Sequence, residues 1–164
     1  MSEHRIEIEV NGRRRTARVE ARRTLADVLR DEWRLTGTHL GCEHGACGAC
    51  TVLIDGQPQR SCLVFAAQLD GHAVTTVEGL APADGGLSEV QEAFRACHGL
   101  QCGFCTPGFV VSVTALLAEE PEPSDEEIVD ALSGNLCRCT GYQGIVAAVR
   151  QASAALVARR ERAS

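Results

Sequence analysis

Residues 41–52 read Gly-Cys-Glu-His-Gly-Ala-Cys-Gly-Ala-Cys-Thr-Val, so that three cysteines, Cys42, Cys47 and Cys50, share a loop of small residues. A fourth cysteine, Cys62, follows after eleven intervening residues. Glycine and alanine leave the backbone unobstructed, so its amide groups can curl closely around sulfur atoms. Thiols at such short spacings are typical of metal sites. We therefore expect this loop to enclose a metal centre in the first half of the chain.

The whole chain has 164 residues and nine cysteines. That length is room for one ordinary domain or two small ones, and the cysteine content is well above ordinary intracellular usage. The first ten residues, MSEHRIEIEV, are charged and alternating and contain no apolar segment of the kind that directs secretion. We therefore expect a cytoplasmic protein whose thiols bind metal or act chemically instead of forming disulfides.

Two classes of function are disfavoured by composition. The longest apolar stretch, residues 109–118, runs into two glutamates and is well short of the roughly twenty residues that a membrane span needs. The formal net charge of -6 argues against a nucleic-acid surface. The sequence predicts neither a membrane span nor nucleic-acid binding.

Patterning in the first half predicts strands and one helix. Apolar and polar residues alternate on both sides of Asn11-Gly12, which is typical of a β-hairpin. Thr24 and Asp27 resemble a capping box, and the apolar residues that follow have helical spacing. The expected elements are strands over 6–10, 16–21, 51–54 and 72–77 and a helix that starts at 25 and ends near 37. Together they predict an α+β domain over residues 1–78.

Residues 79–86 are small and turn-rich and predict a linker. Beyond them the apolar period becomes helical. Four helices are expected: one with apolar residues at 87, 90 and 94, one over 109–117, one opened by a Ser124–Glu127 capping box, and one over 145–157. Thr106 is the expected N-cap of the second helix, with Pro107 as its first residue. Residues 87–164 are thus predicted to form an all-α four-helix bundle.

Four more cysteines lie just before predicted helix starts in this bundle: Cys102 and Cys105 in QCGFC, and Cys137 and Cys139 in CRC. A helix N-terminus carries partial positive charge and free N–H groups, which favour an anionic centre. Taken alone, this set could also hold tetrahedral zinc, because CxxC is a common zinc half-site. CxC is a less usual zinc half-site.

The spacing of the first three cysteines, with four and two residues between them, matches the CxxxxCxxC arrangement of plant-type [2Fe–2S] ferredoxins. The fourth ligand of a plant ferredoxin lies much further along the chain than Cys62 does here. A ferredoxin-like loop in the same chain favours a second [2Fe–2S] cluster over zinc at the bundle cysteines.

The segments 104–108 and 138–142 are weakly alike, which predicts two helix pairs related by an approximate two-fold axis.

The ninth cysteine, Cys97, falls at the end of a predicted helix and is expected to be a small buried core residue. A Rieske centre would need two histidines beside two cysteines. Because cysteines complete both sets, His39, His44, His72 and His98 are expected to be surface or structural residues.

The combination of GCEHGACGACTV, Cys62, QCGFCTPG and CRCTGY closely resembles the small iron–sulfur subunit of the molybdenum hydroxylases, the xanthine oxidase family, over residues 4–152. The resemblance implies an N-terminal β-grasp domain like plant-type ferredoxins, followed by a four-helix domain, each with one [2Fe–2S] cluster. It would make Cys42, Cys47, Cys50 and Cys62 the ligands of the ferredoxin-domain cluster. Cys102, Cys105, Cys137 and Cys139 would hold the cluster nearer molybdenum.

The same resemblance implies partners and a direction for electrons. A large subunit would carry molybdopterin, as the cytosine dinucleotide, and a medium subunit FAD, in a dimer of heterotrimers. Gln101 and Cys139 would approach the molybdopterin, and single electrons would pass through both clusters to FAD or an external acceptor. No residue of this chain is expected to be catalytic.

The loop sequence Glu43-His44-Gly45 departs from the GCDTSxCGAC pattern of carbon monoxide dehydrogenase small subunits. That departure disfavours carbon monoxide and favours an aldehyde, a purine or another N-heterocycle as the substrate of the complex, with reductive hydroxybenzoyl thioester enzymes as an alternative. Two other functions stay open at this level: a free-standing two-cluster ferredoxin and a zinc-stabilised interaction module. The apolar surroundings of the bundle cysteines favour burial against a partner over the free-standing ferredoxin.

Overall fold

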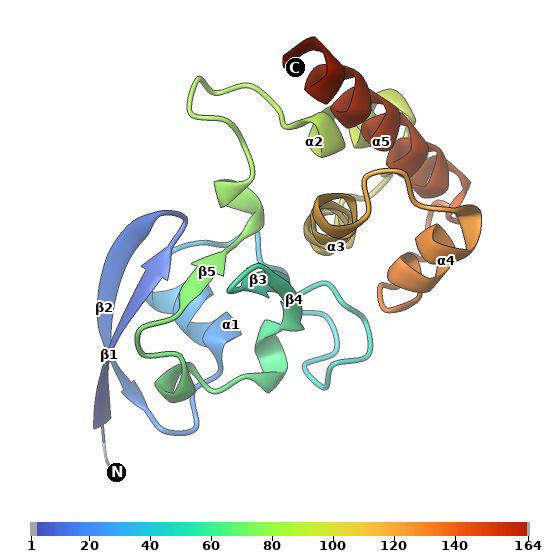
Figure 1. The fold of residues 1–164 in the computed structure, drawn as a ribbon. Coiled ribbons are helices and arrows are strands. Elements are labelled where there is room, and N and C mark those ends of the chain that lie inside the picture. Colours follow the sequence, from blue (N-terminus) through green and yellow to red (C-terminus); the bar gives the residue numbers. More distant parts are fainter. Residues whose placement is uncertain (1–2, 164) are drawn as a thin grey trace.

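The computed structural model describes residues 3–163, which form a sheet-containing half and a helical half (Figure 1). The sheet has five strands in the order β2-β1-β5-β3-β4. β1 and β5 run parallel, and the other neighbouring strands are antiparallel. The strands are β1 (Glu3–Val10), β2 (Arg13–Glu20), β3 (Thr51–Ile54), β4 (Gln57–Arg60) and β5 (Ala73–Thr75).

The predicted opening hairpin is confirmed, with Glu3 opposite Glu20 and Val10 opposite Arg13. Ile6, Ile8 and Val10 are fully buried on the core side of β1, as their alternation requires. β4 was not predicted, because its sequence Gln-Pro-Gln-Arg has no apolar alternation. It is an edge strand, where proline is tolerated, and a two-residue turn with positive φ joins it to β3.

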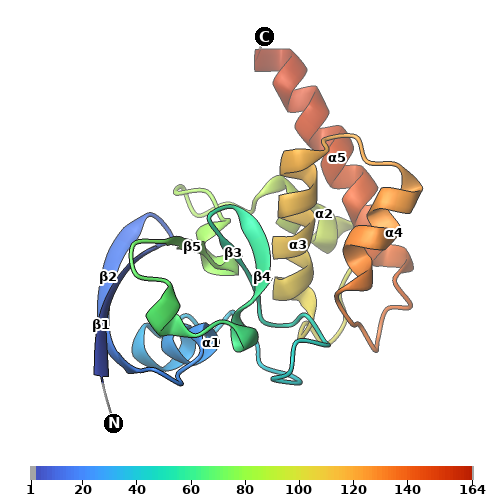
Figure 2. The same ribbon diagram turned by 60° about the horizontal axis from the view of Figure 1, so that its bottom comes forward.

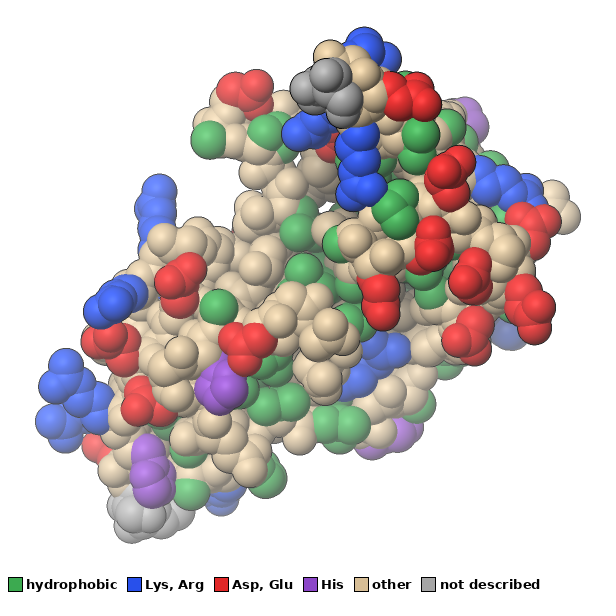
Figure 3. All heavy atoms as spheres, in the orientation of Figure 1, with side chains coloured by type: hydrophobic (Ala, Val, Ile, Leu, Met, Phe, Trp, Pro, Cys, Tyr) green, Lys and Arg blue, Asp and Glu red, His purple; other side chains and the backbone are tan. Residues whose placement is uncertain are grey.

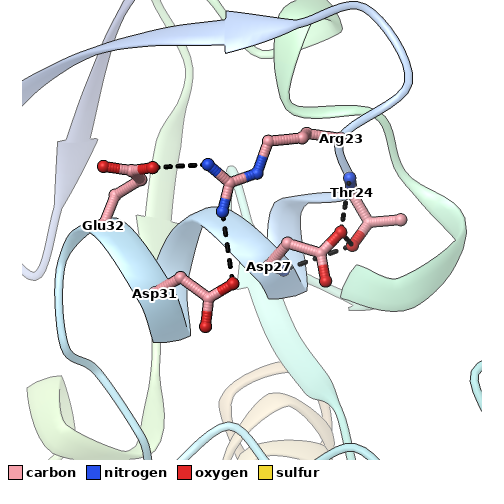
Figure 4. Close-up of polar contacts among 5 residues, drawn as sticks. All are labelled: Arg23, Thr24, Asp27, Asp31 and Glu32. Atoms are coloured by element: carbon pink, nitrogen blue, oxygen red, sulfur yellow. Dashed lines mark hydrogen bonds and ion pairs between the residues drawn. The ribbon is translucent and has the colours of Figure 1, made fainter.

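The predicted helix after the hairpin is present but not uniformly α-helical. α1 (Leu25–Asp27) passes into a π-helical turn, Val28–Glu32, closed by a 3.1 Å hydrogen bond from the Trp33 amide to the Val28 carbonyl. The capping box is confirmed: Thr24 and Asp27 each accept the other's backbone N–H (Figure 4). Figure 4 also shows Arg23 reaching Asp31 and Glu32, which pins the turn from outside.

All four predicted helices of the second half are present: α2 (Glu89–Ala96), α3 (Thr106–Glu119), α4 (Asp125–Ser133) and α5 (Gln143–Ala163). The Ser124–Glu127 capping box of α4 is confirmed. The prediction for α3 was wrong by one residue, because Cys105 is the N-cap and the buried hydroxyl of Thr106 makes no hydrogen bond in the described part of the chain. α5 is longer than expected, and its C-terminal end projects beyond the other helices (Figure 2).

α3 is the central helix, lying between the sheet and the remaining helices in both ribbon views (Figures 1 and 2). Its first turn meets the cysteine loop at Gly108, where an added Cβ would lie 2.2 Å from the Gly48 carbonyl oxygen. Glycine is therefore required at this position for the two halves to close. Each half keeps its own hydrophobic core.

The surface is unevenly charged. Acidic side chains gather over α4 (Figure 3), whose first turn contains Asp125, Glu126 and Glu127. Carboxylates at this end are favourable because the helix N-terminus is partially positive. Within residues 3–163, no helix combines the length and apolar character that crossing a membrane would require.

Candidate metal centres

The first cysteine loop, residues 41–50, contains neither helix nor strand. Glu43, Gly45 and Gly48 have φ values of 57°, 84° and 73°, which reverse the backbone repeatedly. A Cβ at Gly45 would lie 2.5 Å from the Leu63 side chain, so only glycine fits there without a shift. The curled backbone turns amides inward, and the Cys47 N–H donates to Cys42 Sγ over 3.3 Å.

All nine cysteines are free thiols, and eight of them lie in pairs. The pairs are Cys42 with Cys47, Cys50 with Cys62, Cys102 with Cys139, and Cys105 with Cys137. The Sγ atoms of Cys102 and Cys139 are 3.6 Å apart. Each predicted set of four cysteines is thus brought together by the fold, as two pairs.

This donor set fits a [2Fe–2S] cluster, in which each of two iron atoms takes two thiolates. Tetrahedral zinc would need all four sulfurs around one point. The paired thiols therefore favour the two-iron cluster over the zinc alternative.

The thiols of the first set differ sharply in acidity. Hydrogen bonds from the backbone of His44 and then of Cys47 lower the pKa of Cys42 to about 6. Burial, reinforced by the neighbouring Cys50, raises the pKa of Cys62 to about 11. If Cys62 is a ligand, the positive charge of the metal would deprotonate its thiol, and metal binding would release a proton.

The thiols of the second set also differ in acidity. Burial, and then the neighbouring Cys137, raises the pKa of Cys105 to about 12. Burial acts in the same direction on Cys137, but hydrogen bonds from the hydroxyl and amide of Thr140 outweigh it and lower its pKa. The thiol of Cys102 raises the pKa of Cys139.

A turn built by Thr140 and Tyr142 holds Cys137. The Thr140 hydroxyl lies 3.1 Å from Cys137 Sγ, and the Cys137 N–H donates to the Tyr142 hydroxyl over 2.9 Å. That hydroxyl in turn donates to the Asn135 carbonyl, and the Tyr142 ring meets Phe109 edge-on. The cysteine is therefore fixed from both its backbone and its sulfur.

The two cysteine regions are in direct contact. The Leu136 N–H, next to Cys137, donates to the Cys47 carbonyl over 2.9 Å, and the Asn135 side chain donates to the Gly48 carbonyl over 3.0 Å. The side chain of Phe104 stacks on His39, and His39 Nδ1 lies 2.7 Å from the Phe104 carbonyl oxygen. These contacts place the two thiol sets on either side of one short interface.

The other predicted residues are located as follows. Gln101, Cys102 and Cys139 are all exposed. The prediction for Cys97 was wrong: it is half-buried at the edge of the helical core, and its thiol donates to Gln151 Oε1 over 3.0 Å. Helix α2 ends at Ala96, which leaves Cys97 at the surface of the bundle instead of inside it.

The histidines are structural or surface residues, as expected. His44 and His72 are exposed, and each hydrogen-bonds through Nδ1 to a protein oxygen, of Cys42 and Asp55 respectively. His39 is half-buried in its stack on Phe104, and His98 is exposed with a φ of 52°.

Sequence reasoning missed three residues that organise these sites. Thr140 was recognisable, because a threonine three residues after a cysteine and followed by glycine is typical of a side-chain-bonded turn. Asn135 and Leu136 gave no signal, because the groups to which they donate, the Gly48 and Cys47 carbonyls, lie almost ninety residues away in the chain and belong to the backbone.

Family models match both halves: a 2Fe-2S iron-sulfur cluster binding domain over residues 8–81 and a [2Fe-2S] binding domain over residues 76–150. The nicotine 6-hydroxylase small subunit of Paenarthrobacter nicotinovorans is 63% identical over 147 residues, covering 90% of this chain and 88% of that one. The caffeine dehydrogenase subunit gamma of Pseudomonas sp. (strain CBB1) is 54% identical over 156 residues, covering 93% of each chain.

Among solved structures, quinoline 2-oxidoreductase from Pseudomonas putida 86 superposes with a TM-score of 0.91 at 49% identity, covering 96% of this chain and 97% of the matched one. Human aldehyde oxidase is 46% identical over 152 residues, but this chain spans only 11% of that protein. The family models over both halves describe [2Fe–2S] binding, which favours the clusters over the zinc-module alternative. The chain belongs to the small [2Fe–2S] subunits of the molybdenum hydroxylase family, the iron–sulfur electron-transfer subunits of those complexes.

Proposed function

We propose that the two sets of paired thiols are the cluster ligands and that they act in series. Cys42, Cys47, Cys50 and Cys62 bind the cluster of the sheet-containing half, and Cys102, Cys105, Cys137 and Cys139 bind that of the helical half. The clusters supply one-electron redox chemistry. The protein supplies distance, orientation and hydrogen bonds to sulfur.

The observation that carries this proposal is the contact between the two thiol sets. One hydrogen bond joins the backbone of Cys47 to that of Leu136, and Cys137 follows directly in the chain. Few covalent bonds and no solvent gap therefore separate a proposed ligand of one cluster from a proposed ligand of the other. We infer that electrons enter at the exposed pair Cys102 and Cys139 and leave through the first set.

Exposed apolar side chains support docking against partners on both sides. Within residues 3–163, seven large hydrophobic residues are exposed, and five of them lie within three positions of a proposed ligand: Leu63, Phe65, Leu100, Phe104 and Leu136. Such a concentration marks an interaction surface. We propose that the surface around Leu100 meets a large molybdopterin subunit, with Gln101 and Cys139 approaching the pterin, and that the surface around Leu63 meets an FAD subunit.

The family membership of the chain supports a proposal for the assembly and its substrate. We propose a dimer of heterotrimers in the cytoplasm, and a division of this chain into residues 1–78, a linker over 79–86, and residues 87–164. Several of the relatives are named for N-heterocyclic compounds: nicotine, caffeine and quinoline. We propose that the complex containing this chain also hydroxylates an N-heteroaromatic ring, at a site on its large subunit.

The ligand assignment is tested by electron paramagnetic resonance (EPR) of the dithionite-reduced complex. The wild type should give two distinguishable [2Fe–2S] signals. Cys137→Ser should remove one signal and Cys50→Ser the other, while Cys97→Ser, the matched control, should keep both. Two signals that survive both ligand substitutions would refute the assignment.

The order of the clusters is tested by reducing the same variants with substrate. In Cys50→Ser, substrate should still reduce the helical-half cluster but no longer reach the downstream acceptor. In Cys137→Ser, substrate should reduce neither the first-half cluster nor the acceptor. The opposite pattern would reverse the proposed route.

The partner surface is tested with two substitutions of exposed apolar residues. Leu100→Glu should reduce the amount of large subunit that copurifies with this chain, because it places a charge where apolar contact is proposed. Val129→Glu, at another exposed apolar position, on α4 and not next to a cysteine in the chain, should not. A chain that purifies alone with both clusters stable in air would instead favour the free-ferredoxin alternative.

A further inference from the structure

The hydroxyl of Thr140 is aimed at a cysteine sulfur. Its Oγ1 lies 3.1 Å from Cys137 Sγ, and the Tyr142 N–H donates to the same oxygen over 3.1 Å. A hydroxyl has one proton to donate and lone pairs to accept with. Because the Tyr142 amide occupies an acceptor site, the hydroxyl proton is free to point toward the sulfur.

The turn leaves this hydroxyl little freedom to move away. Gly141 and Tyr142 have φ values of 62° and 67°, which fold the backbone back over Cys137. The Tyr142 hydroxyl accepts the Cys137 N–H, and its ring rests edge-on against Phe109, which is fully buried. The oxygen–sulfur contact is therefore held by the core of the bundle and not by the side chain alone.

The contact also distinguishes Cys137 from the other proposed ligands. Within residues 3–163, it is the one hydrogen bond between a side-chain hydroxyl and a cysteine sulfur. The sulfur of Cys42, by contrast, is bonded by backbone amides, which only a proline substitution would remove. Thr140 is thus a donor whose effect on a cluster can be isolated by mutation.

We propose that Thr140 is a positioning residue that raises the reduction potential of the helical-half cluster by donating its hydroxyl proton to Cys137 Sγ. The inference rests on the ligand set of the proposed function. Reduction adds one electron to the cluster and breaks no bond. A donor strengthens its hydrogen bond as the sulfur gains negative charge, so it stabilises the reduced state more than the oxidised one.

The test is an EPR-monitored redox titration of the whole complex with dithionite as the reductant. Thr140→Val keeps the shape of the side chain and removes the donor. We expect the equilibrium constant for reducing the helical-half cluster to fall about tenfold, which is about 59 mV for a one-electron couple. Thr140→Ala should give the same fall without a branched side chain in the turn, and Thr140→Ser should restore the wild-type potential.

Two internal controls accompany the titration. Thr114→Val removes a hydroxyl from α3 that bonds only to the Val110 carbonyl, and it should leave both potentials unchanged. The first-half cluster should keep its potential in every variant. An unchanged potential in Thr140→Val and Thr140→Ala, or a fall in Thr140→Ser equal to theirs, would overturn the inference. A wild-type complex without a second cluster signal would instead overturn the proposed ligand set.

Discussion

The backbone N–H of Leu136 donates to the carbonyl oxygen of Cys47 over 2.9 Å, joining the two cysteine regions of the chain. Both residues belong to segments without regular structure, so neither group is used by a helix or a strand. Unsatisfied backbone groups at an interface are costly, and this bond satisfies one from each side. It therefore contributes both to closure of the interface and to the path proposed for electrons.

Replacing Leu136 tests the role of this hydrogen bond. Leu136→Pro deletes the donor and should weaken the interface by about 1 kcal/mol, the usual net worth of a hydrogen bond. Electron transfer between the clusters should slow several-fold, as measured by rapid-freeze EPR after substrate is mixed with the complex. Leu136→Ala keeps the amide and trims a side chain that is 55% exposed, so its rate should match the wild type. Equal rates in Leu136→Pro would remove this bond from the path.

Asn135 is the buried link between α3 and the first cysteine loop. Its Oδ1 accepts from the Ser112 hydroxyl and its Nδ2 donates to the Gly48 carbonyl, each over 3.0 Å. Asn135→Ala leaves the Ser112 hydroxyl buried without its bond, while the Gly48 carbonyl keeps the bonds that it accepts from the Thr51 N–H and hydroxyl. The substitution should therefore cost about 1–3 kcal/mol. The thermal midpoint of the complex should fall accordingly, whereas Ser133→Ala, which removes an exposed hydroxyl, should shift it little. A small shift for Asn135→Ala would mean that water replaces the lost bonds.

Most elements of the fold could be predicted from local sequence patterns. The hairpin, the two capping boxes and the four helices follow from residues that act within a few positions of one another, such as Thr24 with Asp27 and Ser124 with Glu127. These patterns did not predict the strand whose residues pair because of their position at the edge of the sheet. Gln57 to Arg60 form a strand because β3 offers a free edge and not because they are apolar.

The grouping of cysteines was predictable from spacing, but their surroundings were not. The spacing of the cysteines determines which thiols can lie close together. The Asn135 side chain and the Leu136 N–H instead donate to backbone carbonyls, which every residue possesses and which therefore leave no mark in the sequence. Cys97 was misjudged for a related reason. Its helix ends at Ala96, one residue before it, and the apolar pattern does not reveal which side of the final turn faces solvent.

Removing the clusters should loosen the cysteine segments and leave the sheet intact. Residues 41–50 and 136–142 contain no helix or strand, so in the absence of metal only scattered hydrogen bonds hold them. The β1–β2 ladder pairs eight residues of each strand and does not depend on the cysteines. Hydrogen exchange measured before and after chelation should show protection lost in the two segments and kept in the hairpin. Equal loss in both would indicate that the clusters stabilise the whole fold.

Phe104 and His39 form the second bridge between the two cysteine regions, and it lies at the surface. Their rings stack with centroids 4.8 Å apart, and Phe104 remains 48% exposed between two proposed ligands, Cys102 and Cys105. His39 also contacts the Phe104 backbone through Nδ1, so it anchors the loop as well as the ring. Loss of this anchor should admit solvent to the cysteines that flank Phe104.

His39→Leu removes both the stack and the backbone contact, while His39→Phe keeps the stack. Stacked rings contribute about 0.5–1.5 kcal/mol beyond their burial. In air, visible absorption from the helical-half cluster should therefore bleach several-fold faster in His39→Leu than in the wild type, with His39→Phe between them. His72→Leu, at an exposed histidine bonded to Asp55, serves as the control and should bleach at the wild-type rate. If His39→Leu also bleached at that rate, the stack would not shield the cluster, and burial against the partner subunit alone would have to account for its protection.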